Sequence, residues 1–404
     1  MQQQFEDWAD EFGGSYELFM FGTRRIIVVD PAETRRLLAL RPATFGRGAS
    51  AGFIDMAGRA VGLIPGLFLD DDASWGRSRR LVAPAFNAHN VRNMVPAVAK
   101  IAERLCHKWS AAADGDGIVD AKEDLGRFTH DVIALVGFRH EAQAISAADV
   151  DFRTTYAVLT NMFADLMDLI MSPFRRIVYT WLPFHPWVRR IQRDKAIVKT
   201  LVQRSLKSTT DATTTAQPST KDNPSEGLLL RKLVEAGDGG GGRGKEGRLM
   251  MPDDDIVTQA RSLFIAGQET TSLTLAWSAY FLAKHPHMQA RCREEAMKYV
   301  SSSNGVAKTF EETTSLVYAA AVFKETLRLK TAVPTLGFWA KEDYTMLDGS
   351  TYPKGTSVVA MFRYMATRED SFTRAKDFIP ERRVRHDLVR VWIEAEREEA
   401  LLGK

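Results

Sequence analysis

The chain has 404 residues, of which 45% are hydrophobic and 26% are charged, the composition of a globular protein with a large buried core. Its net charge of +3, with basic and acidic residues interspersed, excludes the strongly basic surface of a nucleic-acid-binding protein. The two cysteines, Cys106 and Cys292, exclude a disulfide framework, and no Cys/His cluster has the spacing of a zinc site.

The chain begins with a polar and acidic segment, which predicts neither a signal peptide nor an N-terminal anchor. We therefore expect a protein of the cytoplasm or of the periphery of an internal membrane. β-type runs cover 15–20, 25–29 and 357–361. Helical periodicity covers most of the remainder, with clear examples at 91–113, 147–171, 186–207, 256–284, 287–300 and 317–329. This pattern predicts a mainly α fold with small β-sheets.

A basic helix is predicted after the acidic run at 70–72. Trp75 and Arg79 lie four residues apart in it and therefore share one helical face. An indole N–H beside a guanidinium group suits a ligand with paired carboxylates. The alternative is an ordinary basic surface helix.

The most apolar stretch, 159–182, contains too many charged residues for a membrane-spanning helix. Its second part and the residues after it are rich in large apolar side chains: Ile177, Val178, Tyr179, Trp181, Leu182, Phe184 and Trp187. We expect these side chains to be buried in the core. The alternative is a peripheral membrane contact near Trp181.

Two low-complexity segments follow, one rich in Thr, Ser, Asp and Pro at 208–226 and one with four consecutive glycines at 237–247. They bracket a single predicted helix at 228–236. Because the helix after them is the most apolar element of the chain, we interpret 208–247 as a flexible insertion between helices rather than a domain boundary.

The helix predicted at 256–284 is apolar on nearly all sides, which places it at the centre of the protein. Its middle nevertheless contains Gly267, Glu269 and Thr270, residue types that a core helix usually excludes. Thr270 can donate a hydrogen bond to the carbonyl of Ala266, which bends the helix and opens a groove for a small ligand. The alternative is a kinked core helix whose threonines satisfy themselves.

Glu325 and Arg328 lie three residues apart on the next apolar helix, so they can form an ion pair. Arg382, some fifty residues later, can complete a buried Arg–Glu–Arg arrangement that fixes the C-terminal loop. A solvated surface pair is the alternative.

Taken in order, these motifs resemble the cytochrome P-450 family of haem-thiolate monooxygenases. The resemblance rests on the Trp75–Arg79 pair, the segment 266–271, the Glu325–Arg328 pair and the segment 378–382. It extends over 1–382, which we interpret as one domain with a cytochrome P-450-like fold.

The resemblance implies a role for each motif. Ala266 and Gly267 would line the oxygen pocket, and Thr270 with Glu269 would be the catalytic pair that passes protons to dioxygen. Trp75 and Arg79 would bind the propionates of haem b. A structural ion triad would consist of Glu325, Arg328 and Arg382.

The resemblance also implies the partners. They are dioxygen, an electron-donating reductase or ferredoxin, and a small apolar substrate that receives one oxygen atom. Substrate contacts would come from 45–64, 263–266 and 333–338, which are rich in apolar residues. An isomerase or dehydratase on the same fold is disfavoured, because such enzymes need no proton relay to dioxygen.

The chain departs from the family pattern after Arg382. The loop Phe-x-x-Gly-x-x-x-Cys-x-Gly, which carries the iron-ligating thiolate, is absent, and 383–404 is an atypical charged tail with helical periodicity. Cys106 and Cys292 lie mid-helix without flanking glycines, so we predict no metal ligand. His386 could substitute, although a surface histidine is the simpler interpretation. Phe338 and Trp339 occupy the neighbourhood of a family arginine that reaches a propionate.

We therefore expect a shortened member of the family, produced by an incomplete gene prediction or by natural truncation. Two functions stay open. The first is a haem-dependent monooxygenase, inactive in the form of this chain. The second is a haem-free helical protein that serves in binding or regulation.

Overall fold

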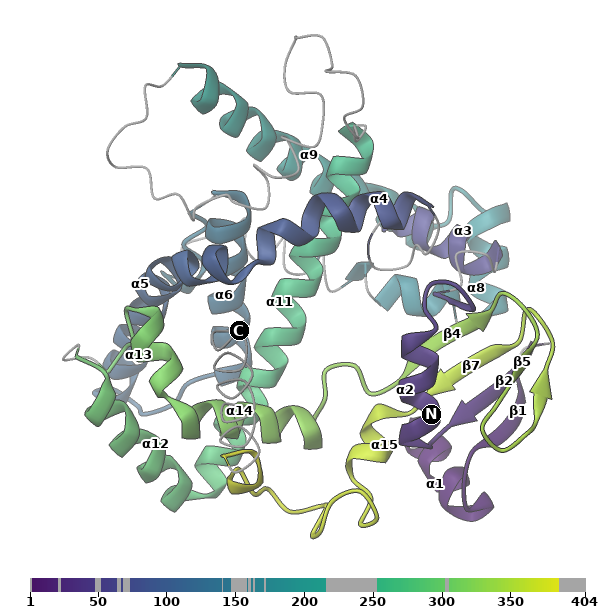
Figure 1. The fold of residues 1–404 in the computed structure, drawn as a ribbon. Coiled ribbons are helices and arrows are strands. Elements are labelled where there is room, and N and C mark those ends of the chain that lie inside the picture. Colours follow the sequence, from purple (N-terminus) through teal and green to yellow (C-terminus); the bar gives the residue numbers. More distant parts are fainter. Residues whose placement is uncertain are drawn as a thin grey trace, which may run out of the picture.

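A computed structural model describes residues 2–20, 23–47, 52–63, 67, 73–139, 141–146, 158, 161–162, 164–170, 172–215, 253–301 and 305–384. Helices form the larger part of the molecule, and a small sheet lies at one side of them (Figure 1). The predicted mainly α fold with small sheets is confirmed.

The α-helices are α1 (Gln2–Phe12), α2 (Pro31–Ala39), α3 (Gly52–Val61), α4 (Ala73–Val82), α5 (Ala88–Ala113), α6 (Ala121–Val132), α8 (Pro173–Trp181), α9 (Pro186–Thr215), α11 (Asp253–Lys284), α12 (Pro286–Tyr299), α13 (Phe310–Ser315), α14 (Val317–Leu329) and α15 (Phe362–Ala366). Shorter turns are the 3-10 helices η1 (Ala83–Phe86) and η3 (Ala144–Ser146) and the π-helix η2 (Ile133–Gly137).

The main sheet joins the two ends of the described chain. Its strands β1 (Tyr16–Met20), β2 (Thr23–Val28), β3 (Phe45–Gly46), β4 (Leu336–Ala340) and β7 (Ser357–Ala360) have the order β1-β2-β7-β4-β3. Strand β2 pairs in parallel with β7, whereas the other pairs are antiparallel. A separate hairpin is formed by β5 (Tyr344–Thr345) and β6 (Thr351–Tyr352).

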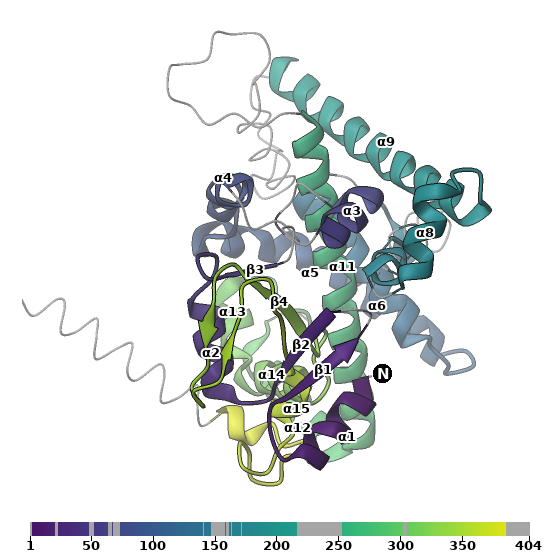
Figure 2. The same ribbon diagram turned by 90° about the vertical axis from the view of Figure 1, so that its right-hand side faces the viewer.

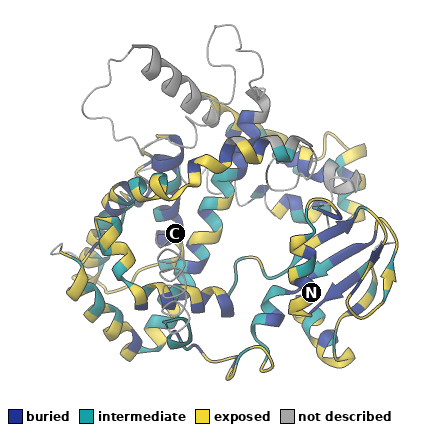
Figure 3. Cartoon of the chain, viewed as in Figure 1, coloured by how far each residue is buried: buried dark blue, intermediate teal, exposed yellow. Residues whose placement is uncertain are grey.

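Helix α11 is the central element of the helical part, as its apolar sequence predicts. It packs against α6, α9, α12 and α14, and both ribbon views show it running through the helical region (Figures 1 and 2). The buried residues follow this arrangement: they include 256–262 of α11, and in β2 consecutive residues such as Ile26 and Ile27 are buried, so both faces of the sheet are covered (Figure 3).

Helix α9 runs beyond its predicted end. The expected loop at 208–226 is wrong for 208–215, which continue the helix to Thr215. No proline or glycine interrupts this stretch before Pro218, so the threonine-rich composition does not end the helix. The remainder of the insertion at 208–247, the predicted helix at 228–236 and the tail at 385–404 with His386 lie outside the described residues, as does most of 147–171.

The expected burial of the aromatic segment is wrong for most of its members. Ile177, Trp181, Leu182 and Phe184 are exposed, whereas Val178 is buried. Helix α8 is a short amphipathic helix that turns only one narrow face inwards, so the large side chains at its end project outwards. None of the helices in the described ranges is long and apolar enough to span a membrane.

Candidate active site

The middle of α11 has an open polar face within an otherwise packed helix. Every residue from 256 to 262 is buried, whereas Ala266, Thr270 and Thr271 are exposed. The hydroxyl of Thr270 donates to the Ala266 carbonyl oxygen over 2.7 Å, so the predicted back-bond is confirmed. This bond orients the hydroxyl and leaves its oxygen lone pairs available on the open face.

The hydroxyl pattern continues along α11. Thr274 donates to the Thr270 carbonyl over 2.8 Å, and Ser278 donates to the Thr274 carbonyl over 2.9 Å. The same Ser278 hydroxyl lies 3.1 Å from the Thr326 hydroxyl of α14, so its single proton is shared between these two acceptors. A chain of side-chain hydroxyls therefore extends from the open face towards the contact between α11 and α14.

Glu269 precedes Thr270 and is half-buried. Within the described part of the chain, its carboxylate accepts no hydrogen bond, whereas its backbone carbonyl accepts one from the Ser272 hydroxyl over 3.0 Å. The carboxylate and the Thr270 hydroxyl are thus neighbours on the helix without a bond between them.

Gly267 and Gln268 are directed at α6 and η2. A Cβ on Gly267 would lie 3.0 Å from Ile133 Cδ1, so the glycine permits the close approach of η2 to α11. Gln268 is buried, and its Oε1 lies 3.3 Å from His130 Nδ1 of α6. The sequence singled out Gly267 for a pocket role, but it gave no signal for its contact with Ile133 or for the Gln268–His130 pair.

We expect Gly267→Ala to lower the free energy of unfolding by about 1–2 kcal/mol, because the crowding of Ile133 in the packed contact with η2 outweighs the gain in helix propensity. The matched control is Gly76→Ala in α4, where a Cβ would meet nothing within 4 Å. That change should instead raise stability by about 0.5–1 kcal/mol through helix propensity. Urea denaturation measures both, and equal gains would contradict the packing role of Gly267.

Trp75 and Arg79 lie on one face of α4, as their spacing predicts. The guanidinium carbon of Arg79 is 5.6 Å from the centre of the Trp75 ring, and Arg79 is exposed. Buried Gln259 ties α4 to α11 by donating to the Ser78 hydroxyl over 2.9 Å. Gln259 precedes Ala266 by seven residues, about 10 Å along the helix, which sets the Trp75–Arg79 pair beside the N-terminal half of α11.

Glu325 is the centre of a buried ion cluster. Its Oε1 accepts from Arg328 Nη2 over 2.7 Å and from Arg382 Nε over 3.0 Å, and its Oε2 accepts from Arg328 Nε over 3.0 Å. Glu325 and Arg328 are almost fully buried. The Arg382 side chain comes from the segment after α15, so the structure brings the three residues together across 57 residues of sequence.

Both arginines also bind the backbone of the loop that follows α15. Arg328 donates to the carbonyls of Ala366, Ala375 and Asp377. Arg382 donates to those of Thr373 and Arg374. These bonds satisfy loop carbonyls that would otherwise be exposed or unpaired, and they fix the path of 366–377.

The two cysteines do not fit an iron–thiolate centre. Burial and the nearby Glu295 raise the pKa of the Cys292 thiol to about 11, and burial also raises the pKa of Cys106. Both changes disfavour the thiolate. In the ranges that the structure describes, no group of three or more His, Cys, Asp or Glu side chains is arranged to hold a metal ion.

Phe338 and Trp339, which stand where the resemblance would place an arginine that reaches a haem propionate, lie in apolar surroundings. Phe338 is fully buried in the core of the sheet, and Trp339 packs with the cluster around α3 and α11. Phe45 is buried in the same sheet core, so the expected substrate contacts at Phe45 and Phe338 are replaced by structural packing. Leu263 and Phe264 on α11 are only partly buried and remain candidates for contact with a ligand.

The sequence profile described as Cytochrome P-450 matches residues 1–384. The chain belongs to the cytochrome P-450 family. The fold agrees, because the crystal structure of a cytochrome P-450 named CYP102L1 superposes with a TM-score of 0.76 over 94% of this chain and 81% of the other at 19% identity.

Characterised relatives are distant in sequence. Secologanin synthase 2 of Catharanthus roseus is 28% identical over 305 residues, which cover 74% of this chain and 53% of the relative. Cytochrome P-450 97B2, chloroplastic, of Glycine max is 25% identical over 400 residues, which cover 93% of this chain and 65% of the relative. The chain thus spans between about half and two thirds of the length of these two members of the family.

Membership of the family implies haem. The residues of this chain suit one side of a haem site, where oxygen binds, but not the other side, where a protein ligand binds the iron. The open face of α11 fits the oxygen side, since it presents the Thr270 hydroxyl beside the small side chain of Ala266, whereas Gly267 packs against η2. The iron-ligand side does not fit, because neither cysteine of the 404 residues has the required setting. A thiolate would have to be supplied by residues other than these.

Proposed function

We propose that this chain contains the substrate- and oxygen-facing part of a haem-dependent monooxygenase that inserts one atom of dioxygen into a small apolar organic substrate. The observation that carries the proposal is the open face of α11, where Thr270 and its neighbours are exposed in the middle of a buried helix. Haem b, when bound, supplies the activation of dioxygen. The chain's own residues handle protons, orientation and substrate contact.

Thr270 and Glu269 are the proposed catalytic pair. The Thr270 hydroxyl donates to the Ala266 carbonyl, so its oxygen can accept a hydrogen bond from a group on the open face while its own proton is directed to the helix. The Glu269 carboxylate has no competing hydrogen bond among the described residues and can exchange protons with water at the face. Together they would supply protons at a fixed point of α11.

The other site residues support this face in the proposal. Exposed Ala266 leaves room beside Thr270, Gly267 lets η2 pack closely behind this face, and partly buried Leu263 offers an apolar contact to the substrate. Trp75 and Arg79 would bind the haem carboxylates. The cluster of Glu325, Arg328 and Arg382 has a structural role. A reductase or ferredoxin with an acidic surface would dock near the basic residues of α4.

The unsuitable cysteines favour a second candidate. In it, the chain is a haem-free helical protein that binds an apolar ligand or regulates a partner. The two candidates differ in one chemical property, the presence of a thiolate-bound iron.

The test begins with the transcript, read past the codon for Arg383 in all three frames. The monooxygenase proposal expects a glycine-flanked cysteine codon followed by an apolar helix. The protein that carries this cysteine should give a thiolate-type Soret band when it is reduced and exposed to carbon monoxide. A confirmed stop after Lys404, together with no such band from the purified chain, would favour the haem-free candidate.

In the cysteine-bearing protein, we expect Thr270→Val to lower the rate of product formation by about 10²-fold, because the hydroxyl is lost while the side-chain volume is kept. Thr270→Ser is the matched control and should retain most of the activity. The measurement is the amount of product formed per electron consumed from the reductant. Equal activity of the Val and Ser variants would remove Thr270 from the catalytic pair.

A further inference from the structure

His130 of α6 lies behind the middle of α11. It is 4% exposed, and it contacts two residues of α11 that are four positions apart. Its Nδ1 lies 3.3 Å from Gln268 Oε1, and its ring makes an edge contact with the ring of Phe264 at 5.1 Å between centres. Because the oxygen of an amide only accepts, this bond places the ring proton on Nδ1. His130 thus spans one turn of α11, the turn that contains Ala266 and Gly267.

The support behind α11 continues into η2. Ile133, three residues after His130, begins this π-helix, and its Cδ1 lies 3.0 Å from the position that a Cβ on Gly267 would take. The end of α6 is itself anchored, because buried Asp131 accepts the backbone N–H of Ala144 over 2.8 Å. The groups that press on α11 from behind are therefore fixed in place.

These contacts lie opposite the open face of α11. At about 100° per residue, Phe264 and Gln268 are about 160° around the helix from Ala266 and Thr270. The Thr270 hydroxyl bonds to the Ala266 carbonyl over 2.7 Å, so its place depends on the shape of this turn. Hydroxyls that bond back to the fourth preceding carbonyl bend a helix, and Thr274 makes the same bond one turn later. The support behind the turn decides how far it bends.

We propose that His130 is a positioning residue of the proposed active site. It holds Phe264 and Gln268, which fixes the bend of 264–270 and thereby the place of the Thr270 hydroxyl on the open face. His130 acts through these residues and touches no reacting group, since it lies on the other side of α11. The inference rests on the proposed function, because the place of Thr270 matters only if protons are delivered at this face.

The first test is hydrogen exchange of the full 404-residue chain. His130→Phe keeps an aromatic ring against Phe264 but removes the donor to Gln268. We expect exchange at the amides of 266–271 to become about two- to tenfold faster, the change that follows from the loss of one hydrogen bond. Exchange at 275–282 should stay within about twofold of its original rate.

Leu125→Ala is the matched control on the same pair of helices. Leu125 of α6 is buried in a cluster with Leu275 and Ala276 of α11, about two turns beyond the contacts of His130. Its truncation leaves a cavity there, so it should speed exchange at 275–282 rather than at 266–271.

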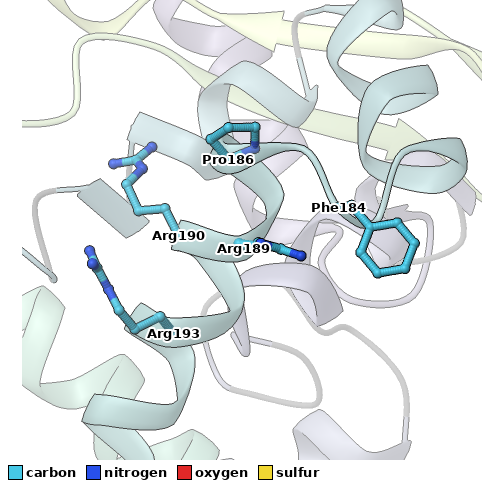
Figure 4. A pocket seen from close by; sticks show the side chains of 5 residues that line it. All are labelled: Phe184, Pro186, Arg189, Arg190 and Arg193. Carbon is cyan, nitrogen blue, oxygen red and sulfur yellow. The ribbon is translucent and has the colours of Figure 1, made fainter.

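Arg190→Leu is the matched control for the loss of a polar contact. Arg190 lines a hollow at the start of α9 (Figure 4) and donates to the buried carboxylate of Asp165. Its replacement also takes a donor from a buried acceptor, but at a contact that does not involve 264–270. Exchange in that part of α11 should change by no more than about twofold. Circular dichroism shows whether each variant is folded.

The second test is the amount of product formed per electron consumed by the cysteine-bearing protein. His130→Phe should lower this ratio about three- to tenfold, less than Thr270→Val does, because the hydroxyl is present but displaced. Leu125→Ala and Arg190→Leu should leave the ratio within about twofold of its original value.

The outcomes separate this inference from the proposed function. An unchanged ratio in Thr270→Val would contradict the proposed function, and hydrogen exchange alone would then decide whether His130 holds the turn. A lowered ratio in Thr270→Val together with an unchanged ratio in His130→Phe would overturn the inference. The same pattern of exchange in His130→Phe and Leu125→Ala would overturn it too, since that result is expected of a general packing contact.

Discussion

Replacing Glu325 by glutamine is expected to lower the free energy of unfolding by about 3–5 kcal/mol. The substitution removes the negative charge but keeps the size of the side chain. It leaves Arg328, whose side chain is 1% exposed, without a counter-ion in the interior. An uncompensated buried charge is costly because the solvation that it loses on folding is no longer replaced.

The loss of stability is large because the Glu325 carboxylate binds several partners at once. In addition to Arg328 and Arg382, the backbone N–H of Ile379 donates to Glu325 Oε1 over 3.2 Å, and Arg383 Nε lies 3.7 Å from Oε2. A glutamine oxygen can accept only part of these bonds, and its NH₂ group would face guanidinium donors. The segment that Arg382 anchors should therefore loosen first, which hydrogen exchange at 373–379 would detect.

The same cluster predicts a dependence of stability on pH. Burial of the Glu325 carboxyl opposes ionisation, but hydrogen bonds and charges from Arg328 and Arg382 outweigh it and lower its pKa below 4.5. A carboxyl whose pKa is lower in the folded state stabilises the protein above its unfolded pKa, and the stabilisation is lost as the pH falls through the folded value. We expect stability to fall below about pH 4.5 in the native protein, and less steeply in Glu325→Gln.

Glu141→Gln is the control for this prediction. Glu141 pairs with Lys100 at 3.0 Å, but both side chains are about half exposed, so its loss should cost at most about 1 kcal/mol. Urea denaturation at neutral pH compares the two variants. A loss in Glu325→Gln no larger than that in Glu141→Gln would show that the buried cluster contributes little to stability.

The sequence predicted the elements whose signal is local. Helix α14 has its predicted bounds, and Thr270 bonds to Ala266 as the four-residue spacing suggests. The Glu325–Arg328 pair is likewise encoded by neighbours on one helix. In each case the interacting groups lie within one or two helical turns, so periodicity alone fixes their relation.

Contacts between distant elements had no such signal. Gln259 bonds to Ser78 across 181 residues, and His130 meets Gln268 across 138. Each residue alone is an ordinary polar residue of its helix, and only the packing of α4 and α6 on α11 gives it a partner. The exposure of Trp181 was missed for a related reason. The apolar periodicity of a helix does not show which of its residues will pack against another element.

Strand β4 was missed because its five residues, 336–340, lack a regular alternation and overlap the segment 333–338 that was assigned to substrate contact. Its role is set by pairing with β3 and β7, whose sequences lie about 290 residues before it and 20 after it. A sheet of this kind depends on pairing between strands that lie far apart in the sequence, so a short stretch of sequence does not reveal it.

Phe338 on β4 is the position at which this long-range packing has the largest predicted cost. Its side chain is fully buried, in a cluster with Phe45, Val358 and Ala360 from the neighbouring strands. Phe338→Ala should lower the free energy of unfolding by about 3–5 kcal/mol, because the cavity is enclosed by strands that are held by hydrogen bonds and cannot collapse into it.

Phe19→Ala provides the matched control, since Phe19 lies on β1 of the same sheet and is 73% exposed. Its loss should change stability by no more than about 0.5 kcal/mol. Equal losses for the two variants, measured by urea denaturation, would contradict the buried position of Phe338. A larger loss at Phe338 would show that an apolar sheet core occupies the neighbourhood where the family places an arginine. The stability of this part of the sheet would then come from packing between strands that lie far apart in the sequence, which the local sequence of β4 does not encode.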